Sequence, residues 1–491
     1  MRLIEALKNS KYTENGAEAY ASTLNKVYDM FAFAGAYRNR SDEDVVTLFQ
    51  EAYEENPELA LKCLFWARDR AGGAGERRFF RVCLHWLGDE SPLNVKVNLH
   101  LIPTFGRWDD IYALCDTKSE AFAMGYLANQ LQTDYHLDYP SIAAKWAYSC
   151  NCSSAEHRAL AHKTRKYCHM TEKEYRNMLS TIRARLNVLE RIMSAKEWDK
   201  IDFSKIPSVA GFRYSHCFMT REELANRYKE FLNGKEVKVN ASVLYPYECM
   251  KMARNLKKDD TIGRKALDIY WNSLPDFTEG KDTSNFMCVC DTSGSMMDMG
   301  YGSVKPIDVA ASLAVYFAER AKGPFANHYI SFSSRPELIE IKGKDFYEKA
   351  TSVINNYLLD NTNLERVFDL LLNIAMSGKV AAEDFVKNLF IISDMEIDGA
   401  LGRYRDYDVG SLMEKIQHKW ETSTNIPFPH LYYWNVNARE NTILSLKNAS
   451  FISGASPAIL KAVLSGKTGY ELCLEVLMSE RYQGVKYYAE D

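Results

Sequence analysis

The spacing of apolar residues changes near residue 280, and this change divides the chain into two parts of different fold class. Before it, apolar residues recur at helical spacing in segments joined by short connections. After it, short apolar runs alternate with helical patterns. The chain has 491 residues, 46% hydrophobic and 26% charged, which excludes disorder as its main character and allows two or three packed domains. We therefore predict domains at residues 1–280 and 281–491.

The first part is predicted to be a solenoid of helical hairpins. Its predicted helices cover residues 58–70, 76–87, 111–131, 141–148, 154–167, 171–197, 220–232 and 246–272. Each helix pair must bury an apolar face against the next pair, so the hairpins stack side by side. No strict sequence period is present, so the repeats are degenerate.

The second part is predicted to be a Rossmann-like α/β domain. Its predicted strands cover residues 286–291, 328–334, 389–394 and 429–436. Helices are predicted between them, at residues 307–321, 364–377, 410–420 and 457–464. Continuous apolar strands that alternate with helices are typical of a mostly parallel sheet covered on both faces.

Oxygen-bearing side chains gather where these strands end. The first strand runs directly into Asp291-Thr292-Ser293-Gly294-Ser295, and Asp394 ends the third. Thr362 lies in an Asp-Asn-Thr-Asn loop just before a predicted helix. Ligand sites of open α/β sheets lie at the carboxyl ends of strands, and hard divalent cations such as Mg²⁺ prefer oxygen ligands. The sequence therefore predicts a metal site at this edge.

This pattern resembles the metal-ion-dependent adhesion site (MIDAS) of von Willebrand factor A domains. The resemblance implies a bound Mg²⁺, or another divalent cation such as Mn²⁺ or Ca²⁺. It also implies that three hydroxyls bind the ion directly and that two carboxylates bind it directly or through water. The residues that match these positions are Ser293, Ser295, Thr362, Asp291 and Asp394.

Two features of the match differ from the family or stay open. Thr351 and Ser352 compete with Thr362 for the loop position. The family often has glycine after the second aspartate, where this chain has Met395. Sites of this kind leave one coordination position open for a partner carboxylate, so the resemblance implies binding of an acidic protein partner. We do not expect an enzyme, because no His or Lys is placed by sequence as a general base for metal-assisted hydrolysis.

Charge is distributed unevenly along the chain. The formal net charge is -4 and the pI about 6.3, which disfavours a strongly cationic nucleic-acid binder on bulk charge. Residues 157–191 are nevertheless rich in Lys and Arg. This stretch is interpreted either as a solvated helix face or as a phosphate-binding patch. If it is a patch, the candidate RNA-binding residues are Lys163, Arg165, Lys166, Arg176, Arg183 and Arg185.

A helical solenoid followed by an A domain resembles the TROVE architecture of the Ro autoantigen, and an uncharacterised related family of bacteria and phages. The motifs that carry the resemblance are Trp66-Ala67-Arg68-Asp69-Arg70, Gly72-Gly73-Ala74-Gly75-Glu76-Arg77, Gly106-Arg107-Trp108-Asp109-Asp110, Ala144-Lys145-Trp146, Glu174-Tyr175-Arg176 and Ile206-Pro207-Ser208. It implies HEAT-like repeats that close into a ring, and binding of small structured or single-stranded RNA.

Two functions follow from these expectations. The first is a Ro-like, RNA-binding ribonucleoprotein scaffold with a metal-binding A domain. The alternative is a metal-dependent protein-interaction scaffold without RNA binding. No apolar stretch is long enough to span a membrane, and the N-terminus does not have the pattern of a signal peptide. We therefore expect a cytoplasmic protein without a membrane partner.

Overall fold

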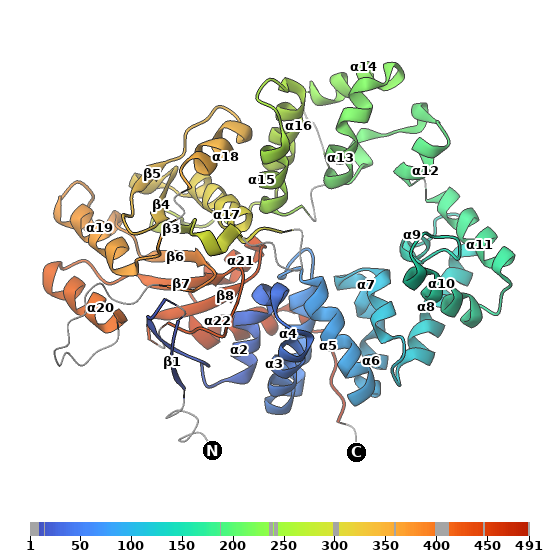
Figure 1. The fold of residues 1–491 in the computed structure, drawn as a ribbon, viewed down its shortest axis with the longest axis horizontal. Helices are drawn as coiled ribbons and strands as arrows, with labels where there is room; N and C mark the ends of the chain where they lie inside the picture. The colour runs from blue at the N-terminus through green and yellow to red at the C-terminus, as the bar shows by residue number, and fades with distance from the viewer. Residues whose placement is uncertain are drawn as a thin grey trace.

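A computed structural model describes residues 9–13, 15–186, 188–234, 239, 244–297, 304–357, 360–397, 412–444 and 447–489. It consists of a helical part and a sheet domain, as the sequence predicts. The helices trace an arc that leaves the sheet domain and returns to it (Figure 1). No helix within these ranges is both long and apolar enough to cross a bilayer.

The helical part follows a short antiparallel hairpin, β1 (Ser10–Tyr12) and β2 (Glu18–Tyr20). Its main α-helices are α2 (Lys26–Phe33), α3 (Asp42–Glu55), α4 (Pro57–Arg68), α5 (Arg77–Glu90), α6 (Pro92–Asn98), α7 (Ile102–Phe105), α8 (Glu120–His136), α9 (Ala143–Trp146), α10 (Ala155–Tyr167), α11 (Glu172–Arg185), α12 (Leu189–Ser194), α13 (Ser208–Thr220), α14 (Glu222–Leu232), α15 (Pro246–Asn255) and α16 (Thr261–Asn272). Short 3₁₀ helices connect some of them, including η1 (Ala34–Asn39) and η3 (Trp108–Leu114).

Local capping explains several of these boundaries. Ser41 and Asp44 form a capping box that starts α3, and Thr171 and Glu174 form one that starts α11. The predicted continuous helix over residues 246–272 is wrong, because the chain leaves helical geometry between α15 and α16. The Asp260 carboxylate accepts from the Gly263 amide at 2.7 Å and starts a new helix there. The predicted helices over 111–131 and 171–197 are likewise each divided in two.

The sheet domain has six strands in the order β5-β4-β3-β6-β7-β8. They are β3 (Phe286–Asp291), β4 (His328–Phe332), β5 (Leu338–Glu340), β6 (Asn388–Ser393), β7 (His430–Asn435) and β8 (Ala449–Ser453). Only β5 is antiparallel to its neighbour. The chain builds outward from β3 in one direction and from β6 in the other, so the topological switch point lies between these two strands. The four strands predicted from sequence are confirmed.

Helices cover this sheet: α17 (Pro306–Arg320), α18 (Phe346–Asn355), α19 (Leu364–Met376), α20 (Leu412–Ser423), α21 (Leu460–Val463) and α22 (Gly469–Leu477). Residues 306–318 of α17 are buried without interruption. A helix that is buried all round must have protein on opposite sides. The sheet packs against one side of α17 and the last helical repeat, through α15, against another.

The start of the helical part also packs on the sheet domain, so the arc is closed by contacts at both ends. Tyr20 and Ile443 exchange backbone hydrogen bonds of 2.7 and 2.9 Å. The Phe451 amide in β8 donates to the Tyr28 hydroxyl of α2 at 2.9 Å. At the other end, Trp271 of α16 stacks on Phe346 of α18 with ring centroids 3.9 Å apart.

The glycine-rich turn between α4 and α5 joins the first repeats, the last repeat and the C-terminal segment. Asp69 is buried and accepts from Arg481 and from the Tyr482 hydroxyl, the latter at 2.9 Å. The Tyr245 hydroxyl, just before α15, donates to the Arg70 carbonyl at 2.9 Å. Gly75 has φ +74° and lies directly against Tyr245. This turn is therefore a structural junction.

A substitution at Gly35 in η1 can test how closely the first helices must approach the sheet. A Cβ atom there would lie 2.6 Å from the backbone of Ser453 and Gly454, so Gly35→Ala must push the two parts apart. We expect it to lower the free energy of unfolding by roughly 1–3 kcal/mol, measured by urea denaturation.

Gly125→Ala in α8 is the matched control, because nothing lies within 4 Å of its added Cβ. It should raise stability by about 0.5–1 kcal/mol through helix propensity. Equal effects of the two substitutions would contradict the close approach at Gly35.

Candidate functional site

The first candidate site lies at the switch point between β3 and β6. Cys290 and Ile392 are paired neighbours, which brings the ends of the two strands together. One Asp291 carboxylate oxygen accepts from the Ser393 hydroxyl at 2.5 Å, and the other from the Ser293 amide at 2.8 Å. Asp291 is thus held by Ser393, the last residue of β6 and the neighbour of Asp394, and by its own following turn.

The hydroxyls of the Asp-Thr-Ser-Gly-Ser turn lie beside this carboxylate. The Ser293 and Ser295 hydroxyl oxygens are 3.0 Å apart. Ser295 belongs to a 3₁₀ turn, η6 (Gly294–Met297), that directly follows β3. Two adjacent hydroxyl oxygens at a strand end form an oxygen-rich corner, which is the ligand chemistry that Mg²⁺ prefers.

Thr362 reaches the same edge from the loop before α19. Its hydroxyl donates to the Glu396 carbonyl at 3.1 Å, two residues after Asp394. Thr351 instead lies inside α18, where its hydroxyl donates to the Tyr347 carbonyl four residues earlier. The geometry therefore favours Thr362 over Thr351 as the loop member of the set.

The turn after β6 explains how a methionine replaces the glycine of the A-domain pattern. Met395 has φ +68°, in the left-handed region that usually favours glycine. Its amide donates to the Ser393 hydroxyl at 3.0 Å, and Met395 is buried. The glycine-like backbone is thus kept, and the side chain adds to the core.

The two aspartates bring two buried carboxyl groups close together at this edge. Both are buried, and burial raises the pKa of Asp291 to about 7, with the nearby Asp394 carboxylate adding to the rise. The Arg439 guanidinium lies 3.7 Å from Asp394 and offsets part of the charge. A hard divalent cation fits this donor set. The described residues contain no group of three or more His, Cys, Asp or Glu side chains that could hold a metal ion, so the fit of a cation to this site depends on the hydroxyls.

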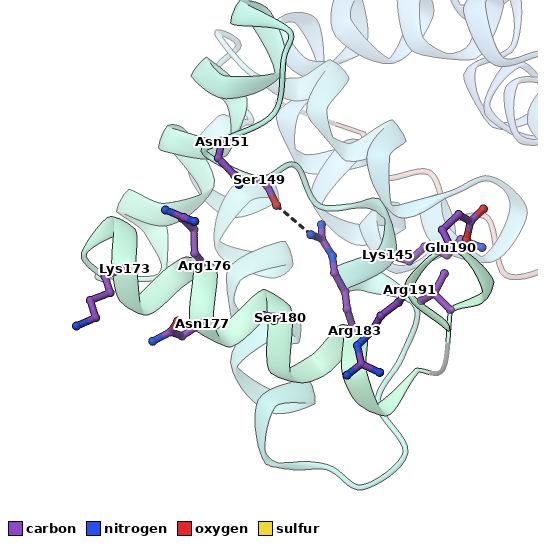
Figure 2. A pocket seen from close by; sticks show the side chains of 11 residues that line it. Lys145, Ser149, Asn151, Lys173, Arg176, Asn177, Ser180, Arg183, Glu190 and Arg191 are labelled. Atoms are coloured by element: carbon purple, nitrogen blue, oxygen red, sulfur yellow. Dashed lines mark hydrogen bonds between the residues drawn. The ribbon is translucent and has the colours of Figure 1, made fainter. Parts of the chain in front are cut away.

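The second candidate site is a basic pocket of about 790 Å³ formed by α9, α11 and α12 with the loop after α9. Glu190 is the one acidic side chain among its lining residues. Hydrogen-bonding side chains also line it: Ser149, Asn151, Asn177 and Ser180. Its basic residues are Lys145, Lys173, Arg176, Arg183 and Arg191. Figure 2 shows Lys173, Arg176 and Arg183 spaced along α11.

Only Arg176 and Arg183 of the six candidates from sequence line this pocket. Arg176 is exposed, whereas Arg183 has a structural role. Arg183 donates to the Ala144 carbonyl, the Ser149 hydroxyl and the Ala147 carbonyl at 2.7–2.9 Å, and Figure 2 shows it turned toward Ser149. These contacts satisfy carbonyls at the end of α9.

The other four candidates point elsewhere. Lys163 pairs with Asp116 and Glu120 at 2.5 and 2.8 Å, and lines a different groove. Arg165 donates to the Met170 carbonyl at 3.0 Å. Arg185 donates to the Tyr135 and Leu137 carbonyls at the end of α8, and Lys166 is exposed outside the pocket.

Sequence reasoning did not select Lys145, Lys173 and Arg191 as site residues. Lys173 and Arg191 lie within the basic stretch, but a count of charges does not show which side chains face one cavity. Lys145 is part of the Ala144-Lys145-Trp146 motif, where it lies 5.7 Å from the Trp146 ring centroid. The adjacent Trp146 was the sequence feature that could have marked Lys145 as a candidate site residue.

Comparison with known proteins gives a family without an assigned function. The family described as "Domain of unknown function (DUF2828)" matches residues 13–132 and 139–277, and "Domain of unknown function (DUF7788)" matches residues 285–484. "Uncharacterized protein L728" of Acanthamoeba polyphaga mimivirus is 26% identical, over 94% of this chain and 86% of its own length.

The Ro (RSR) protein of Deinococcus radiodurans is a similar solved structure, with 14% identity and a TM-score of 0.46, covering 91% of this chain and 100% of that one. A score this low does not establish a shared fold. The match to the first of the two families, in contrast, spans more than half of the sequence, and the chain therefore belongs to the DUF2828 family.

Proposed function

We propose that this protein is an RNA-binding scaffold whose sheet domain is an A-type domain that holds a divalent cation. The basic pocket carries the RNA part of this proposal. Five cationic side chains face one cavity of about 790 Å³ with a single acidic one. Among the described residues, Lys173, Arg176 and Arg191 make no ion pair, so their charge is available to an anionic ligand.

RNA fits this lining better than an isolated anion does. Phosphates pair with Lys and Arg, while the amides and hydroxyls of Asn151, Asn177 and Ser180 can hydrogen-bond to ribose 2′-hydroxyls. The basic groups are spread over the three helices α9, α11 and α12, which suits a ligand with several phosphates. The mild overall acidity disfavours indiscriminate binding elsewhere on the surface.

RNA binding is tested by the double variant Lys173→Glu with Arg176→Glu. Both side chains are exposed and make no hydrogen bond or ion pair with the described residues, so the fold should persist. We expect at least tenfold weaker binding of a small hairpin RNA with a single-stranded tail at low salt. The slope of log affinity against log salt should fall by roughly 1.4–1.8, because two phosphate contacts are lost.

The control is Lys415→Glu on α20, an exposed lysine of the sheet domain. It should leave RNA affinity unchanged. A DNA oligonucleotide of the same sequence should bind more weakly if ribose hydroxyls are read. No binding of the RNA at low salt, or equal losses in the pocket and control variants, would refute RNA binding at this pocket.

The cation is supported by the donor chemistry at the switch point. Ser293, Ser295 and Thr362 would hold the ion through hydroxyl oxygens, and Asp291 and Asp394 would neutralise it directly or through water. A bound divalent cation supplies positive charge between two buried carboxylates that otherwise repel each other. The doubly wound strand order supports the A-type assignment, because it places this set at the switch point.

Thermal unfolding in Mg²⁺ and in chelator tests the cation site. Mg²⁺ at about 100 times its dissociation constant should stabilise the protein by about 2.7 kcal/mol relative to chelator. Ser293→Ala should remove most of this gain, because it deletes one proposed ligand. Ser465→Ala, an exposed serine between α21 and α22, should keep it. A wild-type protein whose unfolding temperature is the same in Mg²⁺, Mn²⁺, Ca²⁺ and chelator would contradict the site.

The alternative, a metal-dependent protein scaffold without RNA binding, receives no separate support. It requires a partner carboxylate to reach the cation. Thr362 and Asp394 are buried, and the Asn15 amide of the N-terminal hairpin already donates to the neighbouring Glu396 carbonyl at 2.8 Å. The basic pocket has no role in that alternative, so RNA binding is the function that we propose.

A further inference from the structure

The C-terminal segment lies along helix α6 of the first repeats. It leaves the sheet domain after a 3₁₀ turn, η10 (Glu480–Tyr482), and runs beside α5 and α6 (Figure 1, red trace toward C). Residues 483–489 form no helix or strand of their own. Their main chain is instead held by two asparagine side chains.

Each asparagine binds both main-chain groups of one residue. The Asn98 amide group donates to the Lys486 carbonyl at 2.7 Å and accepts from the Lys486 amide at 2.8 Å. Asn94 does the same for Tyr488, with both distances 2.8 Å. Asparagines four residues apart share one face of a helix, and residues two apart share one side of an extended chain. The two spacings match, so the face forms a ladder for an extended peptide.

Hydrogen bonds within α6 and its N-terminal turn orient both asparagine side chains independently of the C-terminal segment. The Asn94 amide also donates to the Ser91 hydroxyl at 2.8 Å, and Asn98 donates to the Asn94 carbonyl at 2.8 Å. Both asparagines are at most 2% exposed. The segment covers these amides, so while it is in place its main chain must satisfy the hydrogen-bonding groups that it removes from water.

The alternate side chains of the segment supply sequence preference. Val485 is 3% exposed, and the Tyr487 ring lies 6.3 Å from the Tyr53 ring in an edge-on arrangement. Lys486, between them, is exposed, and Tyr487 keeps 38% of its surface exposed while its ring contacts Tyr53. Main-chain hydrogen bonds give affinity and alternate side chains give specificity in recognition of this kind.

We propose that the α6 face is a binding site for an extended peptide with an aliphatic residue and a tyrosine two positions apart. Residues 485–488 are its resident ligand within the same chain, and a second copy of this segment can replace them. This site is separate from the basic pocket and from the switch point of the sheet, and it does not depend on the proposed function.

The resident segment competes strongly with any peptide added from solution. A tethered ligand acts at an effective concentration on the order of millimolar. A free peptide should therefore bind weakly to the wild-type chain and well to a chain whose own segment is weakened. Val485→Asp in the full-length chain provides this, because it places a charge at a buried position of the segment and leaves α6 unchanged.

The test measures binding of a fluorescent peptide with the sequence of residues 480–489 by anisotropy. We expect at least tenfold tighter binding to the Val485→Asp chain than to the wild type. Adding Asn98→Leu should abolish the gain. Asn255→Leu is the matched control, because Asn255 also donates to the carbonyl four residues earlier, at 2.9 Å, but lies on α15. It should keep the gain.

Binding that is equal in the wild-type and Val485→Asp chains, or that survives Asn98→Leu, would overturn the proposal. Hydrogen exchange on the wild-type chain gives a second measurement that needs no variant. About 10 mM unlabelled peptide should speed exchange of the Lys486 and Tyr488 amides while exchange in α8 stays constant. Unchanged protection of the two amides would also overturn the proposal.

Discussion

The buried carboxylate of Asp69 is one of the contacts that hold the closed arrangement of the molecule together, beside those at the two ends of the arc. It lies at the end of α4 and receives Arg481 and Tyr482 from the last residues of the chain. The turn that follows it cannot carry side chains freely, since a Cβ on Gly73 would lie 2.0 Å from the Trp66 carbonyl oxygen. Loss of Arg481 would leave a buried charge without its cation, which is strongly destabilising. The first repeats, the last repeat and the C-terminus are therefore held at one point.

Sequence pattern predicted the parts of the fold that are buried on both faces. Strands such as β3 and β6 are continuous apolar runs because helices cover both sides of the sheet. The edge strands β5 and β8 were not predicted, because β5 has three residues and serines interrupt the apolar run of β8. The hairpin β1–β2 was also missed, because each of its strands has three residues and its bridge to Ile443 joins positions more than 400 residues apart.

The two candidate sites differed in how far sequence could locate them. At the switch point, each strand end fixes the position of its last residue, so Asp291 and Asp394 had to meet once the strand order was known. On the helices, a basic residue can point to solvent, to a neighbouring carbonyl or into a pocket. Arg183 shows this limit: it lies in the most basic stretch, yet two of its hydrogen bonds go to carbonyls at the end of α9 and a third to the Ser149 hydroxyl. Only the packed structure distinguishes arginines that bind neighbouring carbonyls from arginines that are available to bind a ligand.

The switch-point site and the closure of the molecule share residues. The Glu396 carbonyl accepts from Thr362 at 3.1 Å and from the Asn15 side chain at 2.8 Å, and the Thr13 hydroxyl donates to the Ile397 carbonyl at 2.6 Å. The N-terminal hairpin thus packs on the same loop that carries the second aspartate. The hairpin also pairs with Ile443 through Tyr20. A shift of the loop after β6 would therefore disturb the Tyr20–Ile443 contact, where the helical arc begins. The same few hydrogen bonds therefore fix both the geometry of the oxygen donors and the attachment of the first helices.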